Sequence, residues 1–327
     1  MSVVLQLLKL LDKSFNIKLT RKMYRATLPR EWKHIYDFGP NVHFENKGDG
    51  MVRLFYSGAS VVTLSLPSAI LRSYNQRSDV AWIVASGPSI KDIPLSKIDS
   101  GDVFTVNGSI GAVVESGLKP QGSFIVDRDF FRSKSELVEL SLFKSAHCYF
   151  SGIGLSILLK KGFGDMLANS SVTLFDVVGH QALVPCRRKN ESWSEWARRY
   201  PNLDVSCDYP LVGWSYDPDY GVFGGATIVF AALQLLLSQG YQKIFMLGLD
   251  MHYGGRVARF YESGLNMRPS HLTRDMEAQI IPSFKCAIKA AKENGVELYN
   301  VTEGSGLRDE LIPWISFEQA LSLAHKI

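Results

Sequence analysis

The sequence predicts an α/β fold in which a Rossmann-like parallel sheet carries helices on both faces. From residue 80 onward, short apolar stretches alternate with longer segments that have helical periodicity. Wholly apolar strands are typical of parallel sheets, because both faces of these strands are buried. Ligands of such folds bind at the carboxyl ends of the strands. The alternation therefore predicts the position of a functional site as well as the fold class.

The main domain is expected to span residues 76–327. Its strands are predicted at Trp82–Ala85, Val103–Val106, Ser123–Val126, His147–Phe150, Val172–Phe175, Lys243–Leu247 and Val296–Asn300. Its helices include Thr227–Gln239, Arg274–Asn294 and Ser316–Ala324. Two stretches interrupt this pattern, at about 178–222 and 251–274, and we interpret them as lid segments. Long irregular insertions in a compact α/β domain are usually functional.

Residues 1–75 are predicted to form an N-terminal α+β extension. Apolar residues fall on one helical face near the start of the chain, with lysines and arginines around and beyond them. Such a basic amphipathic helix lies on an anionic membrane surface or packs against its own domain. Further on, the pieces MVRLFYSG and ASVVTLSL flank turns and predict a β-hairpin region at 41–75.

Composition narrows the class of protein. The chain has 327 residues, and 46% of them are hydrophobic, which is ample for a packed core. Its 36 basic and 32 acidic residues are interspersed, which does not favour nucleic-acid binding. Its four cysteines form no CxxC pair, so neither a zinc site nor a disulfide framework is expected. The longest apolar run, from Ala226 to Leu237, is shorter than the roughly 20 residues of a membrane span. These features predict a cytoplasmic protein.

The turn Ser86-Gly87-Pro88-Ser89 follows the first buried strand of the main domain. Gly87 lets backbone amides approach a ligand closely, and Pro88 fixes the turn. Ser89 is predicted to cap the next helix and to leave its first amides free for an anion. The motif is neither a P-loop nor a GxGxxG fingerprint. It is read either as a phosphate-binding turn or as an ordinary connection between a strand and a helix.

Polar or glycine residues also follow the next strands of the domain. Asn107-Gly108, Asp127 and Asp250 each stand at a predicted strand end, and Gly224-Gly225 opens an apolar helix. An amide or a carboxylate at such a position is suited to bind a ribose or a base. Each residue alone is equally compatible with a turn. Their succession along one edge of the sheet favours a nucleotide site.

The segment after Asp250 is dense in donors, bases and cations, which suits an anionic substrate and a mobile lid. These residues are His252, Tyr253, Arg256, Arg259, Tyr261, Arg268, His271, Arg274 and Asp275.

The stretches ASGPSIKDIPLSKIDSGDVFTVNGS, FIVDRDFF and GYQKIFMLGLD together resemble the bacterial sialyltransferases that use CMP-sialic acid. The resemblance is closer to the transferases that add a third Kdo to the lipopolysaccharide inner core. It rests on five segments in the same order: Val106–Ser109, Gly225–Gln234, Gly248–Asp250, Ala258–Tyr261 and Met267–Asp275. It covers residues 80–315 in patches and implies a GT-A-like fold of the sialyltransferase type.

The resemblance implies roles for individual residues. A nucleotide site would contain Ser86, Gly87, Pro88, Ser89, Asn107, Gly108, Asp127, Gly224, Gly225 and Asp250. Tyr261 and Tyr253 would hydrogen-bond the departing phosphate, with Arg259 beside them, and His271 would be the general base. Substrate carboxylates would be held by Arg259, Arg268 and Arg274. Two departures stand out: Asp127 replaces the usual Asn, and the family does not always have His at the position of His271.

The implied enzyme is an inverting glycosyltransferase that moves Kdo from CMP-Kdo to a lipid-linked inner-core acceptor. No cofactor is expected, and no metal, although Asp127-Arg128-Asp129 has the letters of a DxD motif. A lipid-linked acceptor favours a peripheral position on the inner membrane. Three alternatives remain: a sialyltransferase using CMP-sialic acid on lipo-oligosaccharide, a magnesium-dependent pterin diphosphokinase-like enzyme, and a nucleotide-binding module without turnover.

Overall fold

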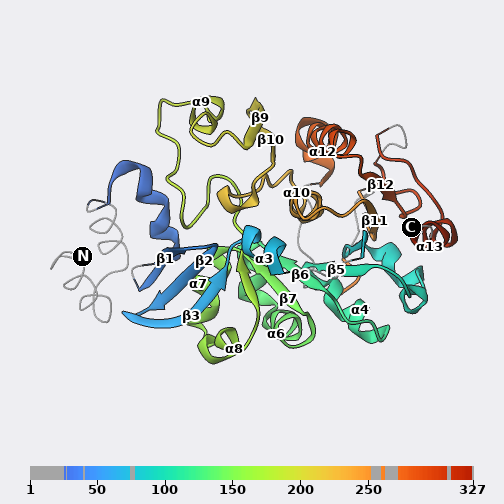
Figure 1. The fold of residues 1–327 in the computed structure, drawn as a ribbon, viewed down its shortest axis with the longest axis horizontal. Helices are drawn as coiled ribbons and strands as arrows, with labels where there is room; N and C mark the ends of the chain where they lie inside the picture. Colours follow the sequence, from blue (N-terminus) through green and yellow to red (C-terminus); the bar gives the residue numbers. More distant parts are fainter. Residues whose placement is uncertain are drawn as a thin grey trace.

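A sheet of ten strands runs through the part of the chain that the computed structural model describes (Figure 1). That part comprises residues 26, 28–39, 41–73, 78–251, 259–261, 272–307 and 311–325. The strand order is β1-β2-β3-β8-β7-β6-β5-β4-β11-β12. The strands are β1 (Val42–Gly48), β2 (Met51–Tyr56), β3 (Ala59–Ser65), β4 (Val80–Val84), β5 (Asp102–Val106), β6 (Gly122–Ile125), β7 (His147–Phe150), β8 (Val172–Leu174), β11 (Lys243–Leu247) and β12 (Glu297–Asn300).

The predicted fold class is confirmed. Strands β4 to β8, β11 and β12 pair in parallel, and every strand predicted for the main domain is present within two residues of its expected bounds. The described helices are α3 (Pro67–Ser73), α4 (Ile110–Glu115), α5 (Arg128–Ser133), α6 (Ser135–Lys144), α7 (Gly152–Lys160), α8 (Gly164–Ala168), α9 (Trp193–Ala197), α10 (Ile228–Ser238), α11 (Leu272–Asp275), α12 (Ile281–Glu293) and α13 (Phe317–Ala324).

Strand direction and order place a topological switch point between β4 and β11. The chain passes from β4 to β5 on one side, and it returns to the other side of β4 only with β11. Connections between parallel strands are right-handed, so segments that run in opposite directions from β4 cover opposite faces of the sheet. Ligands of open α/β sheets bind outside the carboxyl ends of the strands at such a switch. The turn after β4 therefore occupies the expected position of a binding site.

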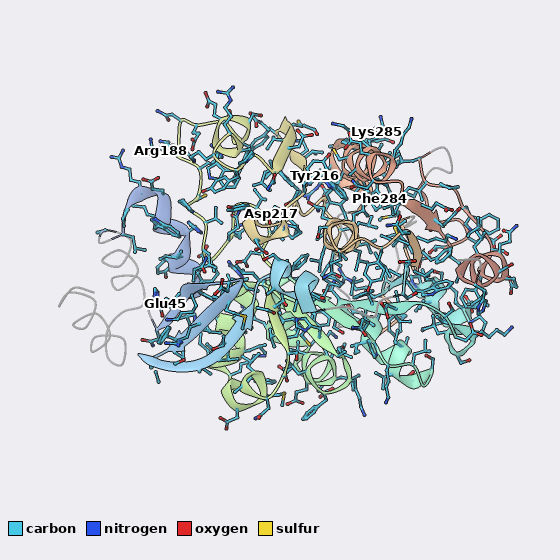
Figure 2. The ribbon with its side chains drawn as sticks, in the orientation of Figure 1. Glu45, Arg188, Tyr216, Asp217, Phe284 and Lys285 are labelled. Carbon is cyan, nitrogen blue, oxygen red and sulfur yellow. The ribbon has the colours of Figure 1, made fainter. Side chains whose placement is uncertain are left out.

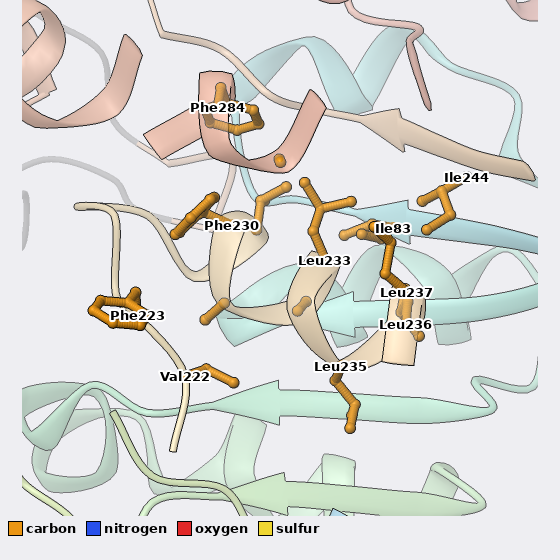
Figure 3. Packing of buried hydrophobic residues seen from close by; sticks show 14 of the residues in the cluster. Ile83, Val222, Phe223, Phe230, Leu233, Leu235, Leu236, Leu237, Ile244 and Phe284 are labelled. Carbon is orange, nitrogen blue, oxygen red and sulfur yellow. The ribbon is translucent and has the colours of Figure 1, made fainter. Parts of the chain in front are cut away.

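Alternate residues of the central strands enter different core clusters. Trp82 packs with Phe245 at 4.4 Å between ring centroids, on the face that α13 covers. Ile83 points to the opposite face, where Leu233 of α10 and Phe284 of α12 belong to the same cluster (Figure 3). Burial on both faces is what makes these strands apolar throughout, and it holds their carboxyl ends on a rigid platform.

The hairpin region near the N-terminus belongs to the same sheet. Strands β2 and β3 form the predicted hairpin, and β1 extends it to an antiparallel meander of three strands. Strand β3 then pairs in parallel with β8, where Ser65 lies opposite Thr173 and the two hydroxyl oxygens are 2.7 Å apart. The domain boundary expected near residue 75 stays a prediction. Residues 1–25, including the predicted amphipathic helix, lie outside the described residues. No helix among the described residues is long and apolar enough to cross a membrane.

The segment 178–222 contains regular structure, which its composition does not predict. It includes α9 and an antiparallel pair, β9 (Leu203–Asp208) and β10 (Leu211–Ser215). The guanidinium of Arg188 lies 3.6 Å from the carboxylate of Glu31, and the Tyr216 hydroxyl donates to Glu293 at 2.8 Å. Figure 2 labels Arg188 and Tyr216. The segment therefore connects the N-terminal part of the fold with α12. Its role as a lid stays a prediction.

The helix predicted at Arg274–Asn294 is interrupted. Helix α11 leads into a π-helical turn, Met276–Ile280, and only then does α12 begin. Pro282 stands in the first turn of α12. Because proline has no amide hydrogen and clashes with the preceding turn, it resists an uninterrupted α-helix at this point. The helix predicted at Ser316–Ala324 is confirmed, and a capping box between Ser316 and Gln319 starts it.

Candidate functional site

The turns that follow β4 and β11 meet at the switch point. The Ala85 amide donates to the Leu247 carbonyl at 2.7 Å, and the Gly87 amide donates to the Gly248 carbonyl at 3.0 Å. The two strands therefore continue to pair beyond their ends. This pairing brings Ser86-Gly87-Pro88-Ser89 against Gly248-Leu249-Asp250, two motifs that the sequence places 160 residues apart.

The carboxylate of Asp250 fastens the Gly-Pro-Ser turn. Its Oδ2 atom accepts hydrogen bonds from the Ser89 hydroxyl at 2.7 Å and from the Ser89 amide at 3.2 Å. A β-carbon added to Gly87 would lie 1.9 Å from the same oxygen. Position 87 therefore requires glycine because the segment Gly248–Asp250 approaches it closely, and Asp250 has a defined structural partner. Hydrogen bonds to a charged carboxylate are among the stronger ones in proteins.

The prediction that Ser89 caps a helix with free amides is wrong. Gly87 holds the N-cap position, and Pro88–Asp92 form a short 3-10 helix without a side-chain cap. Asp250 engages both the amide and the hydroxyl of Ser89. The Asp250 carboxylate thus occupies the Ser89 donors at the turn where the sequence predicts that an anion binds. Any anion at this turn must therefore bind beside Asp250 or displace it.

Asn107 combines a strained backbone with an unsatisfied side chain. Its φ angle is 51°, in the left-handed region that residues other than glycine seldom adopt. Its side-chain oxygen Oδ1 is buried and has no hydrogen-bond partner among the residues that the structure describes. A buried acceptor without a partner costs roughly 1–3 kcal/mol, and local strain gathers at functional sites. Both observations indicate an acceptor held in place for a ligand.

Tyr261 lies directly over the end of β5. A β-carbon added to Gly108 would be 2.1 Å from its ring, so the ring packs on the glycine backbone. The Phe260 amide donates to the Ser86 carbonyl at 3.2 Å, and Lys134 Nζ lies 5.6 Å from the Tyr261 ring centroid. The segment 259–261, which includes the half-buried Arg259, thus crosses the first two strand-end turns.

A pocket of about 630 Å³ lies beside this crossing, and Gly108, Phe260 and Tyr261 form part of its wall.

The contacts described above bring together six residues of the predicted nucleotide site: Ser86, Gly87, Ser89, Gly108, Asp250 and Tyr261. Three other predicted residues, Tyr253, Arg268 and His271, lie outside the described residues.

Asp127 caps helix α5 at the next strand end. Its Oδ1 atom accepts from the Asp129 amide at 2.8 Å, and its side chain is exposed. Asp129 in turn pairs with Arg132 at 3.2 Å. Among the residues that the structure describes, no group of three or more His, Cys, Asp and Glu side chains is placed to hold a metal ion.

The glycine pair at the start of α10 lies farther along the same edge of the sheet. A β-carbon at Gly224 would be 3.4 Å from Val177, just beyond β8, and Gly225 has a φ angle of 54°. Thr227 caps α10 by accepting from the Val229 amide. The loop is held by Gln234, which the sequence analysis did not single out. Its Oε1 atom accepts from the Phe223 amide at 2.9 Å, and its Nε2 atom donates to the Phe223 carbonyl at 2.8 Å.

Arg274 does not reach the strand ends in this structure. Its guanidinium is largely exposed and pairs with the carboxylate of Asp275 at 2.7 Å. The pairing raises the pKa of Arg274 further above its usual value. Its predicted contact with a substrate carboxylate would require the side chain to leave this partner.

Sequence reasoning missed Asp176, which follows β8 as Asp127 follows β6. Its carboxylate accepts from the Gly152 amide at 2.7 Å and from the Ala182 amide at 2.8 Å. Burial raises its pKa to about 6, although the two amides oppose that shift. The rule that selected Asp127, a polar residue just after a buried strand, also selects Asp176.

Comparison with known proteins agrees with the motifs. Residues 201–318 match the family model described as 3-deoxy-D-manno-octulosonic acid transferase WaaZ, where the sugar acid is Kdo. The chain is 25% identical over 262 residues to the probable 3-deoxy-manno-octulosonic acid transferase of Escherichia coli strain K12, which covers 75% of this chain and 85% of that protein. The chain resembles the WaaZ Kdo transferases. The predicted resemblance is confirmed, and so is the predicted enzyme class, a glycosyltransferase.

A second relative and several solved structures also match. The Salmonella typhimurium protein of the same description is 24% identical over 238 residues, covering 72% of this chain and 86% of that protein. Among solved structures, the sialyltransferase Cst-I of Campylobacter jejuni is 16% identical, with a TM-score of 0.39 over 72% of this chain and 80% of that chain. The MAf glycosyltransferase of Magnetospirillum magneticum is 12% identical, with a TM-score of 0.41 over 75% of this chain. The chain spans 34% of the length of that glycosyltransferase.

Proposed function

We propose that this protein transfers Kdo from CMP-Kdo to a Kdo-terminated acceptor of the lipopolysaccharide inner core, with inversion at the anomeric carbon. The match of residues 201–318 to the Kdo transferase model carries this proposal. The matched range contains the Gly224-Gly225 loop, Asp250 and Tyr261. Asp250 is also the residue that holds the turn after β4, so the family match and the strand-end site share a residue.

In this proposal the nucleotide lies along the ends of β4, β5 and β6. Asn107 Oδ1 accepts a hydrogen bond from CMP, which offers donors in its cytosine amino group and ribose hydroxyls. One hydrogen bond from CMP would give the buried Asn107 Oδ1 atom a partner. Ser86, Gly87, Pro88 and Gly108 bring backbone close to the phosphate, and Asp127 and the glycine pair line the rest of the donor site.

The acceptor hydroxyl oxygen attacks the anomeric carbon of Kdo while the bond from that carbon to the phosphate oxygen breaks. CMP leaves with the electron pair, and His271 takes the proton of the hydroxyl, because an imidazole titrates close to neutral pH. Tyr261 and Tyr253 donate hydrogen bonds to the departing phosphate, which stabilises its charge. The guanidinium groups of Arg259, Arg268 and Arg274 hold substrate carboxylates.

We expect the transfer to proceed without a metal, because CMP is a single-phosphate leaving group. Purified protein in EDTA should release CMP from CMP-Kdo only when the acceptor is present. His271→Ala should lower that rate by roughly 10²–10⁴-fold, which is the usual contribution of a general base. Release only from CMP-sialic acid would instead identify a sialyltransferase. Loss of turnover in EDTA with recovery in magnesium would contradict the metal-free mechanism.

A lipid-linked acceptor also suggests contact between residues 1–25 and the membrane. Residues 1–25 contain six lysines and arginines, and the only acidic residue among them is Asp12. Deletion of residues 1–25 should reduce binding to anionic liposomes in a sedimentation assay, and added salt should weaken the binding of the intact chain. Unchanged liposome binding after the deletion would contradict this contact.

A further inference from the structure

A second pocket, of about 450 Å³, lies at the carboxyl ends of β6, β7 and β8. Its volume is within the range of small-molecule sites. The segment Arg30–Phe38, a 3-10 helix labelled η1 here, forms its outer wall. No residue of its lining lies within 201–318, so the family match does not describe this pocket.

The pocket adjoins the proposed donor site on two sides. Val126 of its lining directly precedes Asp127. Val177, another lining residue, lies within 3.4 Å of the space that a β-carbon on Gly224 would fill. A molecule in this pocket would therefore sit next to one bound along the ends of β5 and β6.

The outer wall is anchored to the rest of the fold. His34 Nε2 is 2.8 Å from the Gln181 carbonyl oxygen, and Lys160 Nζ donates to the Phe38 carbonyl at 3.0 Å. The Cys186 amide donates to the Glu31 carbonyl at 2.8 Å. Contacts at both ends of η1 give the pocket a fixed shape, which favours binding because little order must be gained on association.

Two polar groups of the lining are already engaged by the protein. The Ser151 hydroxyl donates to the Val126 carbonyl at 3.0 Å and accepts from the Gly154 amide. Both carboxylate oxygens of Asp176 accept backbone amides. These residues build the floor of the pocket and hold the strand ends in place.

Other polar groups keep hydrogen-bonding capacity for a ligand. Arg128 and Asp37 lie 3.9 Å apart, beyond direct hydrogen-bond distance, and both side chains are partly exposed. His34 is engaged by the protein, because its Nε2 atom lies 2.8 Å from the Gln181 carbonyl oxygen and its ring also interacts with the Glu31 backbone. Burial lowers the pKa of His34, although the backbone hydrogen bonds to Gln181 and Glu31 oppose that shift. Apolar walls are supplied by Phe38, Ile153 and Val177.

We propose that this pocket binds the terminal sugar of the acceptor, a hydroxylated sugar acid. Arg128 contacts its carboxylate, Asp37 accepts its hydroxyl protons, and the apolar wall faces its ring. The ligand class rests on the proposed function, because a Kdo-terminated acceptor presents both a carboxylate and several hydroxyls. The guanidinium fork is well shaped for the carboxylate.

Arg128→Gln tests the assignment, because the side chain is 40% exposed and its replacement should leave the fold intact. Initial rates would be measured with CMP-Kdo and a deacylated, Kdo-terminated inner-core oligosaccharide. We expect the KM for the oligosaccharide to rise about tenfold or more, as for loss of a charge-assisted hydrogen bond, while the KM for CMP-Kdo changes by less than about twofold. Arg132→Gln is the matched control: it lies on the same helix, pairs with Asp129 and is absent from the pocket lining.

An unchanged KM for the oligosaccharide in Arg128→Gln would overturn the assignment, and so would an equal rise for CMP-Kdo. If the wild-type protein transfers no Kdo, the proposed function fails, and calorimetric titration of the same oligosaccharide decides about the pocket. Binding that is weakened by Arg128→Gln but not by Arg132→Gln would still support the sugar site. Absence of binding to the wild-type protein, or equal binding to both variants, would refute it.

Discussion

Gly87→Ala should damage both the fold and the reaction. The new β-carbon would lie 1.9 Å from Asp250 Oδ2 and 2.5 Å from the Gly248 carbonyl oxygen. The backbone carbonyl cannot rotate away, so the two strand-end turns must separate. Such overpacking costs about 1–3 kcal/mol of the free energy of unfolding. Misplacing binding groups by about 1 Å costs roughly 100-fold in rate, so we expect a loss of that size in kcat/KM for CMP-Kdo.

Urea unfolding and acceptor-dependent CMP release would measure these two effects. Gly164→Ala is a suitable control, because its β-carbon would make only an ordinary contact of 3.4 Å with Val61, away from the strand ends. That variant should keep its rate and change stability by no more than about 1 kcal/mol. Wild-type stability and rate in Gly87→Ala would show that the contact with Asp250 is not needed.

Asn107→Gly should weaken the binding of CMP but leave the free energy of unfolding nearly unchanged. Glycine adopts a φ angle of 51° without strain and removes the unpartnered acceptor, so the free energy of unfolding should stay within about 1 kcal/mol of the wild-type value. The affinity for CMP should fall about tenfold or more, because a donor of the nucleotide would be buried without its partner. Calorimetric titration with CMP and urea unfolding would measure the two quantities.

Asp49→Gly provides the matched control for this substitution. Asp49 has a φ angle of 52° in the turn between β1 and β2, so the backbone change is the same, but five strands of the sheet separate β1 from β5. It should bind CMP as the wild type does. If Asn107→Gly also binds CMP like the wild type, Asn107 is strained for a reason other than nucleotide binding.

Local pattern carried the prediction of the main domain, because strands β4 to β8 and β11 are almost entirely buried on both faces. It could not predict that β3 pairs with β8, since the Ser65–Thr173 contact joins segments more than 100 residues apart. The break before α12 was readable in Pro282, whose missing amide was not weighed against the helical periodicity.

In the candidate site, too, the residues are predictable from local sequence pattern but the contacts between them are not. Asn107, Gly87 and Asp250 are found by asking which residues follow buried strands. Their mutual contacts are not, because the Asp250–Ser89 hydrogen bond exists only once β4 and β11 are neighbours. The second pocket could not be predicted from the sequence, because His34 and Asp37 line it only through the tertiary placement of η1.

The central claim is that this protein attaches Kdo to an inner-core acceptor. Mass spectrometry of a Kdo-terminated, lipid-linked acceptor tests it most directly, after incubation with the purified protein and CMP-Kdo generated in the same reaction. We predict that the acceptor gains the mass of one Kdo residue, and that the initial rate of this gain falls roughly 100-fold with Gly87→Ala. An acceptor of unchanged mass, with CMP-Kdo intact or merely hydrolysed, would contradict the claim.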